Sequence, residues 1–214
     1  MDIDVATLFI AFIVLLFSLT VHETAHAWTA DRLGDPTARL LGRVSLNPIV
    51  HADPIGTVLF PIIATLTGVP LIGWAKPVPV NVNRLGHPRR DYMLVAAAGP
   101  ASNLLLAVAA AIARQLFTVS PVTLGEPNIT APLATLLGGA VRINVLLAVF
   151  NMLPIPPLDG GNVLAGLLPP RAAAQFDALV RPFGILVLYA LMFTGLLYDI
   201  VGPLTNRLIN GLLS

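Results

Sequence analysis

The chain has 214 residues, of which 56% are hydrophobic and only 11% are charged, and its mean hydropathy is +0.84. This composition indicates an integral membrane protein and argues against a soluble globular domain. The net charge of +1 gives no reason to expect nucleic acid as a partner, and the absence of cysteine excludes disulfides and thiolate metal sites. We therefore expect a single membrane-embedded domain over residues 1–214.

The first apolar segment, at about 5–28, is long enough to cross a bilayer and carries three ionisable residues near its end. His22 and His26 are four residues apart, so on a helix both imidazoles can reach one metal ion, with Glu23 close beside them. Ionisable side chains at membrane depth are costly, which indicates that they have a use. The simpler alternative is that they mark the water interface.

Three further segments have the length and hydropathy of full crossings, at about 92–113, 133–152 and 183–202. The loop at 115–132 carries Glu126 and no basic residue, so we expect it outside. Basic residues gather after the first crossing, before the second, and between the third and the fourth, which indicates that these loops are cytoplasmic. They are Arg32, Arg39, Arg43, Lys76, Arg84, Arg89, Arg90, Arg171 and Arg181.

Glycines and prolines interrupt the apolar stretch from Ile55 to Trp74. Because both flanking loops are expected to be cytoplasmic, residues 44–73 cannot cross the membrane once, and must re-enter, lie along the interface or form a hairpin. The fold class predicted is an all-α, multi-pass helix bundle with such a segment. At its start, His51 and Asp53 are alternative metal ligands, but turn or interface polarity is the simpler interpretation, because they lack helical spacing.

A second polar cluster follows the third crossing, in the sequence Phe-Asn-Met-Leu-Pro-Ile-Pro-Pro-Leu-Asp-Gly-Gly-Asn of residues 150–162. Its prolines cannot continue a regular helix, so the backbone opens, and Gly160 and Gly161 permit a tight turn after Asp159. This is either a ligand site with one carboxylate or only an exit turn at the membrane surface. Because the first and third crossings run in the same direction, Asp159 and the two histidines belong at the same end.

The chain resembles the site-2 protease family of intramembrane zinc metalloproteases. The resemblance implies one Zn²⁺ held by His22, His26 and Asp159, a water molecule activated by Glu23, and an amide, Asn151, that steadies the substrate carbonyl. No PDZ or nucleotide-sensing regulatory domain is visible in the sequence. The motifs that carry the resemblance are His22-Glu23-Thr24-Ala25-His26, Asn151-Met152-Leu153-Pro154, Pro157-Leu158-Asp159-Gly160, and Gly99-Pro100-Ala101-Ser102-Asn103 in the helix between them.

The segment Lys76-Pro77-Val78-Pro79-Val80-Asn81 alternates small apolar residues with prolines. This pattern suits a short extended edge segment that pairs with an unwound peptide, which makes Lys76, Val78, Val80 and Asn81 candidate substrate-binding residues. A stiff connector is an equally good interpretation, because proline removes pairing donors.

Four other residues have simpler interpretations. Gly99 belongs to a small-residue face, which predicts close helix packing. Asn103 is expected to bond a neighbouring backbone or to support the site, and Asn144 to serve packing. His87, between glycine and proline in a basic loop, is expected at the surface.

Together these features predict a zinc endopeptidase of the cell membrane, with its active site toward the cytoplasmic side. Its partners are the bilayer and membrane-protein substrates cut in or next to transmembrane segments, which must unwind because a helix hides its peptide groups in its own hydrogen bonds. Two alternatives stay open. A metal transporter also places histidine and aspartate at membrane depth, and a catalytically inactive relative would bind helices without cutting them.

Overall fold

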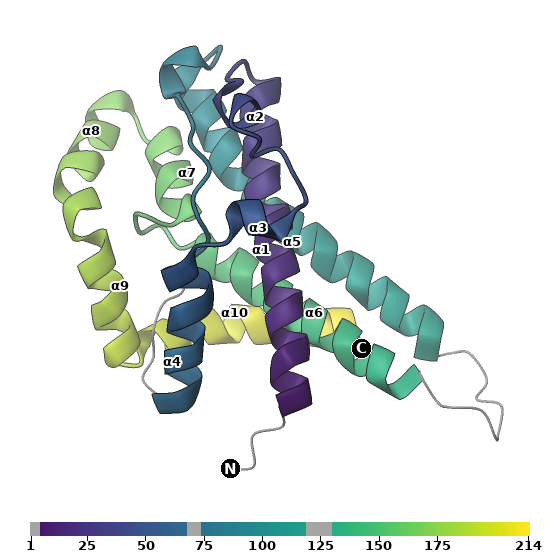
Figure 1. The fold of residues 1–214 in the computed structure, drawn as a ribbon. Helices are drawn as coiled ribbons and strands as arrows, with labels where there is room; N and C mark the ends of the chain where they lie inside the picture. The colour runs from purple at the N-terminus through teal and green to yellow at the C-terminus, as the bar shows by residue number, and fades with distance from the viewer. Residues whose placement is uncertain (1–4, 68–73, 119–129) are drawn as a thin grey trace, which may run out of the picture.

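The computed structural model describes residues 5–67, 74–118 and 130–214, and these ranges form a helix bundle without β-strands (Figure 1). Within them, four helical stretches are long and apolar enough to cross a membrane: Phe9–Arg32, Pro88–Phe117, Pro132–Asn151 and Pro170–Phe193. The predicted all-α membrane bundle is confirmed. The first three expected crossings correspond to α1 (Val5–Arg32), α5 (Pro88–Thr118) and α6 (Thr130–Asn151).

Shorter elements connect these helices. They are α2 (Thr37–Leu40), α3 (Pro48–His51), η1 (Pro54–Leu59), α4 (Phe60–Thr67), η2 (Val82–Arg84), α7 (Asp159–Leu167), α8 (Pro170–Leu179), η3 (Arg181–Phe183), α9 (Gly184–Phe193) and α10 (Leu196–Leu213). The expected outer loop at 115–132 lies largely outside the described residues.

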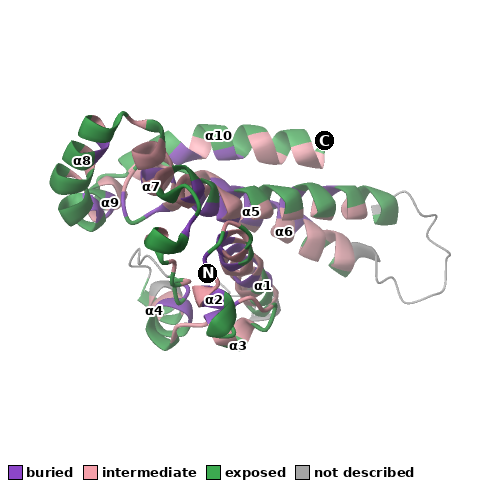
Figure 2. Cartoon of the chain, turned by 90° about the horizontal axis from the view of Figure 1, so that it is seen from above, coloured by how far each residue is buried: buried purple, intermediate pink, exposed green. Residues whose placement is uncertain are grey.

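The centre of the bundle is the packing of α5 against α1 and α6 (Figures 1 and 2). Small side chains let α5 and α6 approach closely, and Ala107, Ala111, Val141 and Val145 form a buried cluster between them. Leu208, Ile209, Leu212 and Leu213 of α10 cover this cluster. Large apolar side chains such as Phe9, Phe17 and Leu105 remain exposed on the outer faces, as expected for surfaces that contact lipid.

The predicted fourth crossing, at 183–202, is wrong. The membrane-length stretch is Pro170–Phe193, made of α8, η3 and α9, and the chain then turns sharply into α10 (Figure 1). The turn is made at Gly195, whose φ of 81° is in the left-handed region that glycine adopts without strain. The apolar run continues through this turn, so hydropathy did not reveal the break.

The stretch from Ile55 to Trp74 returns to where it began. Trp74 donates its backbone N–H to the carbonyl of Gly56 (3.2 Å), and its ring packs edge-on against Phe60 with the ring centroids 5.0 Å apart. Gly56 has no side chain that would collide with this indole. In Figure 1, α4 points toward the end of the bundle at which α1 begins. This return agrees with the prediction that the stretch does not cross once, although residues 68–73 lie outside the described residues.

The junction between α9 and the loop after α6 requires glycine. A Cβ atom at Gly184 would lie only 1.7 Å from the carbonyl oxygen of Pro156. We therefore expect Gly184→Ala to lower the free energy of unfolding by about 1–3 kcal/mol, since overpacking forces the backbone apart. Gly211→Ala in α10, where a Cβ meets open space, is the matched control. Reversible unfolding in mixed detergent measures both, and equal stability of the two variants would contradict the prediction.

Candidate metal centre

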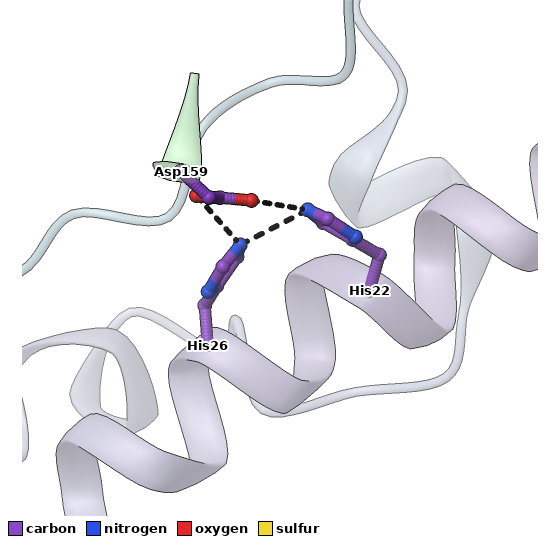
Figure 3. Close-up of side chains that lie close together, drawn as sticks. All are labelled: His22, His26 and Asp159. Carbon is purple, nitrogen blue, oxygen red and sulfur yellow. Dashed lines mark hydrogen bonds and ion pairs between the residues drawn. The ribbon is translucent and has the colours of Figure 1, made fainter. Parts of the chain in front are cut away.

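His22, His26 and Asp159 come together although Asp159 follows His26 by 133 positions in the chain (Figure 3). The Nε2 atoms of the two histidines are 3.0 Å apart, and the carboxylate lies 3.1 Å from His22 and 3.4 Å from His26. Both histidines project from the same face of α1, and Asp159 is the first residue of α7. Within the described part of the chain, this is the one group of three or more such side chains placed to hold a metal ion.

Hydrogen bonds fix the tautomer of each histidine. His26 Nδ1 lies 2.7 Å from the carbonyl oxygen of Val95, which can only accept, so this nitrogen carries the proton. His22 Nδ1 lies 2.6 Å from Asn103 Oδ1. Since Asn103 Nδ2 donates to the Ser18 carbonyl (3.4 Å), the Asn103 oxygen faces His22 and accepts its proton. Both Nε2 atoms therefore present lone pairs to the same point.

A buried carboxylate shares this point with the two lone pairs. Asp159 Oδ2 is buried and receives no hydrogen bond, although His22 Nε2 is 3.1 Å away. Three acceptors that converge without a donor repel one another, so the arrangement favours a cation among them. Two imidazoles and one carboxylate are a ligand set that zinc uses when it keeps one position open.

The network behind His22 was only partly anticipated. Asn103 is fully buried and has both of its expected roles, since it bonds the Ser18 backbone carbonyl and supports His22. Asn144, which we expected to serve packing, accepts from Asn103 Nδ2 (2.8 Å) and donates to Ser18 Oγ (2.9 Å) and the Ala140 carbonyl (2.9 Å). Three helices thus share one satisfied polar chain. The sequence signal for this network is the presence of asparagine in two apolar helices.

Gly99 has a role beyond helix packing. A Cβ atom at this position of α5 would lie 2.5 Å from the His26 ring and 2.6 Å from the His22 ring. Both imidazoles therefore occupy space that any larger residue would fill. The predicted close packing is present, and its purpose includes seating the two histidines.

The loop at 152–158 places Asp159 opposite His22 and His26. Gly160 and Gly161 do not form the expected tight turn. They lie in the first turn of α7, and neither has a positive φ. Their surroundings leave no space for a side chain. A Cβ at Gly160 would lie 2.3 Å from the Met152 carbonyl oxygen, and one at Gly161 would lie 2.7 Å from the Pro156 nitrogen. The glycines are therefore needed for close approach, and α7 starts directly under the proline-rich loop.

Glu23 contacts the segment at 76–81, which runs without helix or strand. Its Oε2 accepts a hydrogen bond from the backbone N–H of Val78 (3.1 Å). Buried Arg43 holds the same segment by donating to the carbonyls of Lys76 (2.5 Å) and Pro77 (3.3 Å), and also to that of Val50 (2.6 Å). From the sequence, Arg43 is expected only as a cytoplasmic charge. Its position just before the 44–73 stretch gave no sign of this contact.

Asp35 holds the other end of the segment. Its Oδ2 accepts from the backbone N–H of Asn81 (2.6 Å), and its Oδ1 accepts from Thr37. Burial raises the pKa of the Asp35 carboxyl, but these hydrogen bonds outweigh burial and lower it, so the group is ionised at neutral pH.

A cavity of about 490 Å³ opens beside the three ligand residues, and Glu23, Asn151, Val78 and Val80 line it. Asn151 does not contact the ligand group; its Nδ2 donates to the Leu147 carbonyl in its own helix (2.9 Å). Of the four candidate substrate-binding residues, Val78 and Val80 line the cavity, whereas Lys76 and Asn81 are absent from its lining.

The alternative ligands lie elsewhere. Asp53 caps η1 by accepting from the backbone N–H groups of Ile55 and Gly56, as turn polarity predicts. His51 is buried, which interface polarity did not predict, and its Nε2 lies 2.8 Å from the Ser45 carbonyl. Burial lowers the pKa of His51, so it is neutral at pH 7. His87 is exposed, as expected.

Comparison with known proteins agrees with this geometry. The model of Peptidase family M50 matches residues 10–194. "Putative zinc metalloprotease YwhC" of Bacillus subtilis is 36% identical over 194 residues, covering 91% of this chain and 84% of that protein. "Putative zinc metalloprotease Rip2" of Mycobacterium tuberculosis is 32% identical over 190 residues, covering 87% and 69%. No solved structure matches the chain significantly. The chain belongs to peptidase family M50.

Proposed function

We propose that this protease is a zinc endopeptidase that hydrolyses peptide bonds in or next to transmembrane segments of membrane proteins. The observation that carries the proposal is the convergence of two imidazole lone pairs and a buried carboxylate beside Glu23, in a cavity large enough for a peptide. The names of the relatives, which specify zinc metalloproteases, support the choice of metal.

The residues present fit one zinc ion per chain. His22, His26 and Asp159 would hold it, and bound zinc would supply a Lewis acid that activates water and polarises the scissile carbonyl. Two neutral imidazoles, two ionised carboxylates and Zn²⁺ sum to zero charge, the least costly state in surroundings of low dielectric constant. The second carboxylate in this count is Glu23.

Glu23 is the proposed general base. It follows His22 directly, lines the cavity, and is oriented by the N–H of Val78 through Oε2, which leaves Oε1 for a water molecule. It would accept the proton from that water and return it to the leaving nitrogen. Asn151, which lines the same cavity, would donate to the developing oxyanion after releasing its bond to Leu147.

The segment at 76–81 is the proposed support for the unwound substrate. Its Lys76 and Asn81 N–H groups are already bonded to the protein, whereas no bond to the described residues is formed by the N–H of Val80 or the carbonyl of Val78. These two backbone groups, both belonging to cavity-lining residues, would pair with an extended peptide. The flanking bonds through Arg43 and Asp35 keep the segment in place.

We further propose one membrane-embedded domain over residues 1–214, located in the cell membrane with its active site toward the cytoplasm. Basic residues support this orientation, since Arg32 ends α1, the helix of His22 and His26, and Arg43 donates to the segment that contacts Glu23. A metal transporter is a weaker alternative, because metal transport does not need a base such as Glu23 beside the ligand residues.

The first prediction from this proposal separates zinc binding from catalysis. Glu23→Gln keeps an oxygen that accepts from Val78, so we expect unchanged zinc content and cleavage of a model transmembrane peptide reduced about a hundredfold or more. Asp159→Ala removes a ligand, so we expect zinc content to fall. Metal analysis of the purified proteins and a peptide cleavage assay measure both, with exposed Asp177→Asn as control.

The outcomes distinguish the alternatives. Full cleavage by Glu23→Gln would refute the role of Glu23 as base. Metal movement into vesicles without cleavage by the wild type would indicate a transporter. Intact substrate binding without cleavage by either protein would indicate an inactive relative.

The second prediction concerns the support of His22. Asn103→Ala removes the acceptor that holds the proton on Nδ1, so we expect zinc affinity to fall about 10–100-fold. Competition with a chelator measures the affinity, and Asn206→Ala on the exposed face of α10 is the control. Equal affinities of the two variants would show that the tautomer is set by other means.

The third prediction concerns Arg43, which clamps the 76–81 segment through its hydrogen bonds to the Lys76 and Pro77 carbonyls. Arg43→Gln leaves buried carbonyls without a charged donor, so we expect stability to fall by about 2 kcal/mol and KM for the peptide to rise, with zinc content unchanged. Arg39→Gln, in the same loop but exposed, is the control. Parallel steady-state kinetics of the two variants make the comparison, and an unchanged KM in Arg43→Gln would contradict the clamp.

A further inference from the structure

The helix α10 packs against the bundle with one face only. Its buried residues Val201 and Thr205 lie on the same face as Leu208 and Leu212, which cover the cluster between α5 and α6. Figure 2 shows α10 at the outer edge of the bundle, beside α5. The opposite face of α10 is exposed in the described part of the chain. It is therefore a surface on which a lipid or another protein can pack.

This exposed face carries two opposite charges. Asp199 and Arg207 are both exposed, and the side chain of neither forms a hydrogen bond or an ion pair with the described residues. Because successive residues of a helix are rotated by about 100°, the two side chains lie about 40° to either side of Pro203 and about 12 Å apart along the axis. Pro203, which is also exposed, is thus the midpoint between an acid and a base.

Both charges lie at membrane depth. Leu208 packs with the cluster that contains Val145, a residue well inside the span Pro132–Asn151, and Arg207 directly precedes Leu208. Figures 1 and 2 show that α10 runs across the direction of α1, so Asp199 lies at a similar depth. A carboxylate or a guanidinium that faces lipid at this depth is costly unless an opposite charge is beside it. The two charges of α10 therefore require partners from outside the described residues.

A second copy of the chain can supply both partners. A two-fold axis along the membrane normal keeps two copies inserted in the same direction, and it makes two helices that lie along the membrane plane antiparallel. With the axis beside Pro203, Asp199 of each subunit meets Arg207 of the partner subunit, because the two residues are four positions to either side of Pro203. One face of α10 thus complements itself.

We propose that this face of α10 binds a second copy of the chain, antiparallel about Pro203, through two symmetric ion pairs of Asp199 with Arg207. Leu196 and Ile200, which are both exposed, would flank the pairs and keep them in surroundings of low dielectric constant, where ion pairs are strong. The inference depends on the chain being in a membrane and does not depend on zinc or on catalysis.

Energy transfer between labelled chains in phosphatidylcholine vesicles tests the proposal. The chain has no cysteine, so the full-length protein with Ser214→Cys accepts one fluorophore, either a donor or an acceptor. We expect the labelled wild type to show energy transfer above the level that random proximity gives at high dilution in lipid. Asp199→Arg and Arg207→Asp each place like charges opposite one another twice, so we expect each to raise the dissociation constant roughly tenfold or more.

The mixture of the two single variants is the sharpest measurement. When Asp199→Arg meets Arg207→Asp, every arginine faces an aspartate, so we expect the mixed sample to recover wild-type energy transfer. The chain with both exchanges, Asp199→Arg/Arg207→Asp, should recover it alone. Recovery also shows that both single variants are folded. Arg171→Asp in α8, an exposed arginine outside α10, is the matched control and should associate like the wild type.

Four results would overturn the proposal. Wild-type energy transfer at the random level would show that the chain does not associate with itself. Unaltered association of both single variants would show that lipid or another protein, and no second copy, meets these charges. Lack of recovery in the mixture would show that the charges do not pair across a two-fold axis. An equal loss in Arg171→Asp would show that the effect is not specific to α10.

Discussion

The structure depends on three hydrogen-bond acceptors held against one another. His22, His26 and Asp159 present two nitrogen lone pairs and a carboxylate to one point in surroundings of low dielectric constant, where like partial charges repel strongly. A cation reverses the sign of every interaction in the group. The surrounding bundle therefore holds the three side chains in an arrangement that the proposed zinc ion would stabilise.

Several parts of the fold serve this purpose. Val95 and the Asn103 side chain keep the protons on the outward nitrogens of the imidazoles, and main-chain carbonyls orient the asparagines in turn. Gly99 provides space for the rings, and Gly160 and Gly161 let α7 start against the loop that precedes it. The side-chain amides of Asn103 and Asn144 are fully hydrogen-bonded, which is the condition under which such groups are tolerated in apolar surroundings.

The chain between α1 and α5 links the metal centre to the proposed substrate support. It leaves α1 through the loop of Arg43, returns at Trp74, and then passes Glu23 as a segment bonded at both ends. Its contact with Glu23 joins the proposed base to the proposed substrate support. A displacement of the segment would therefore affect both orientation of the base and binding of the peptide.

The sequence by itself determined the membrane class, three of the four long helices, the family, and the residue types of the centre, because hydropathy and the spacing of His22 and His26 are local properties of the chain. It also determined that Asp159 lies at their end of the bundle, since charge placement sets the direction of each helix. The sequence did not predict the break at Gly195, because an apolar run has the same hydropathy whether or not it bends. Only the tertiary structure decided that Asn103 and Arg43 support the site. Those contacts depend on how closely helices approach and how each is rotated about its axis, which small residues on facing helices set jointly and no single segment specifies.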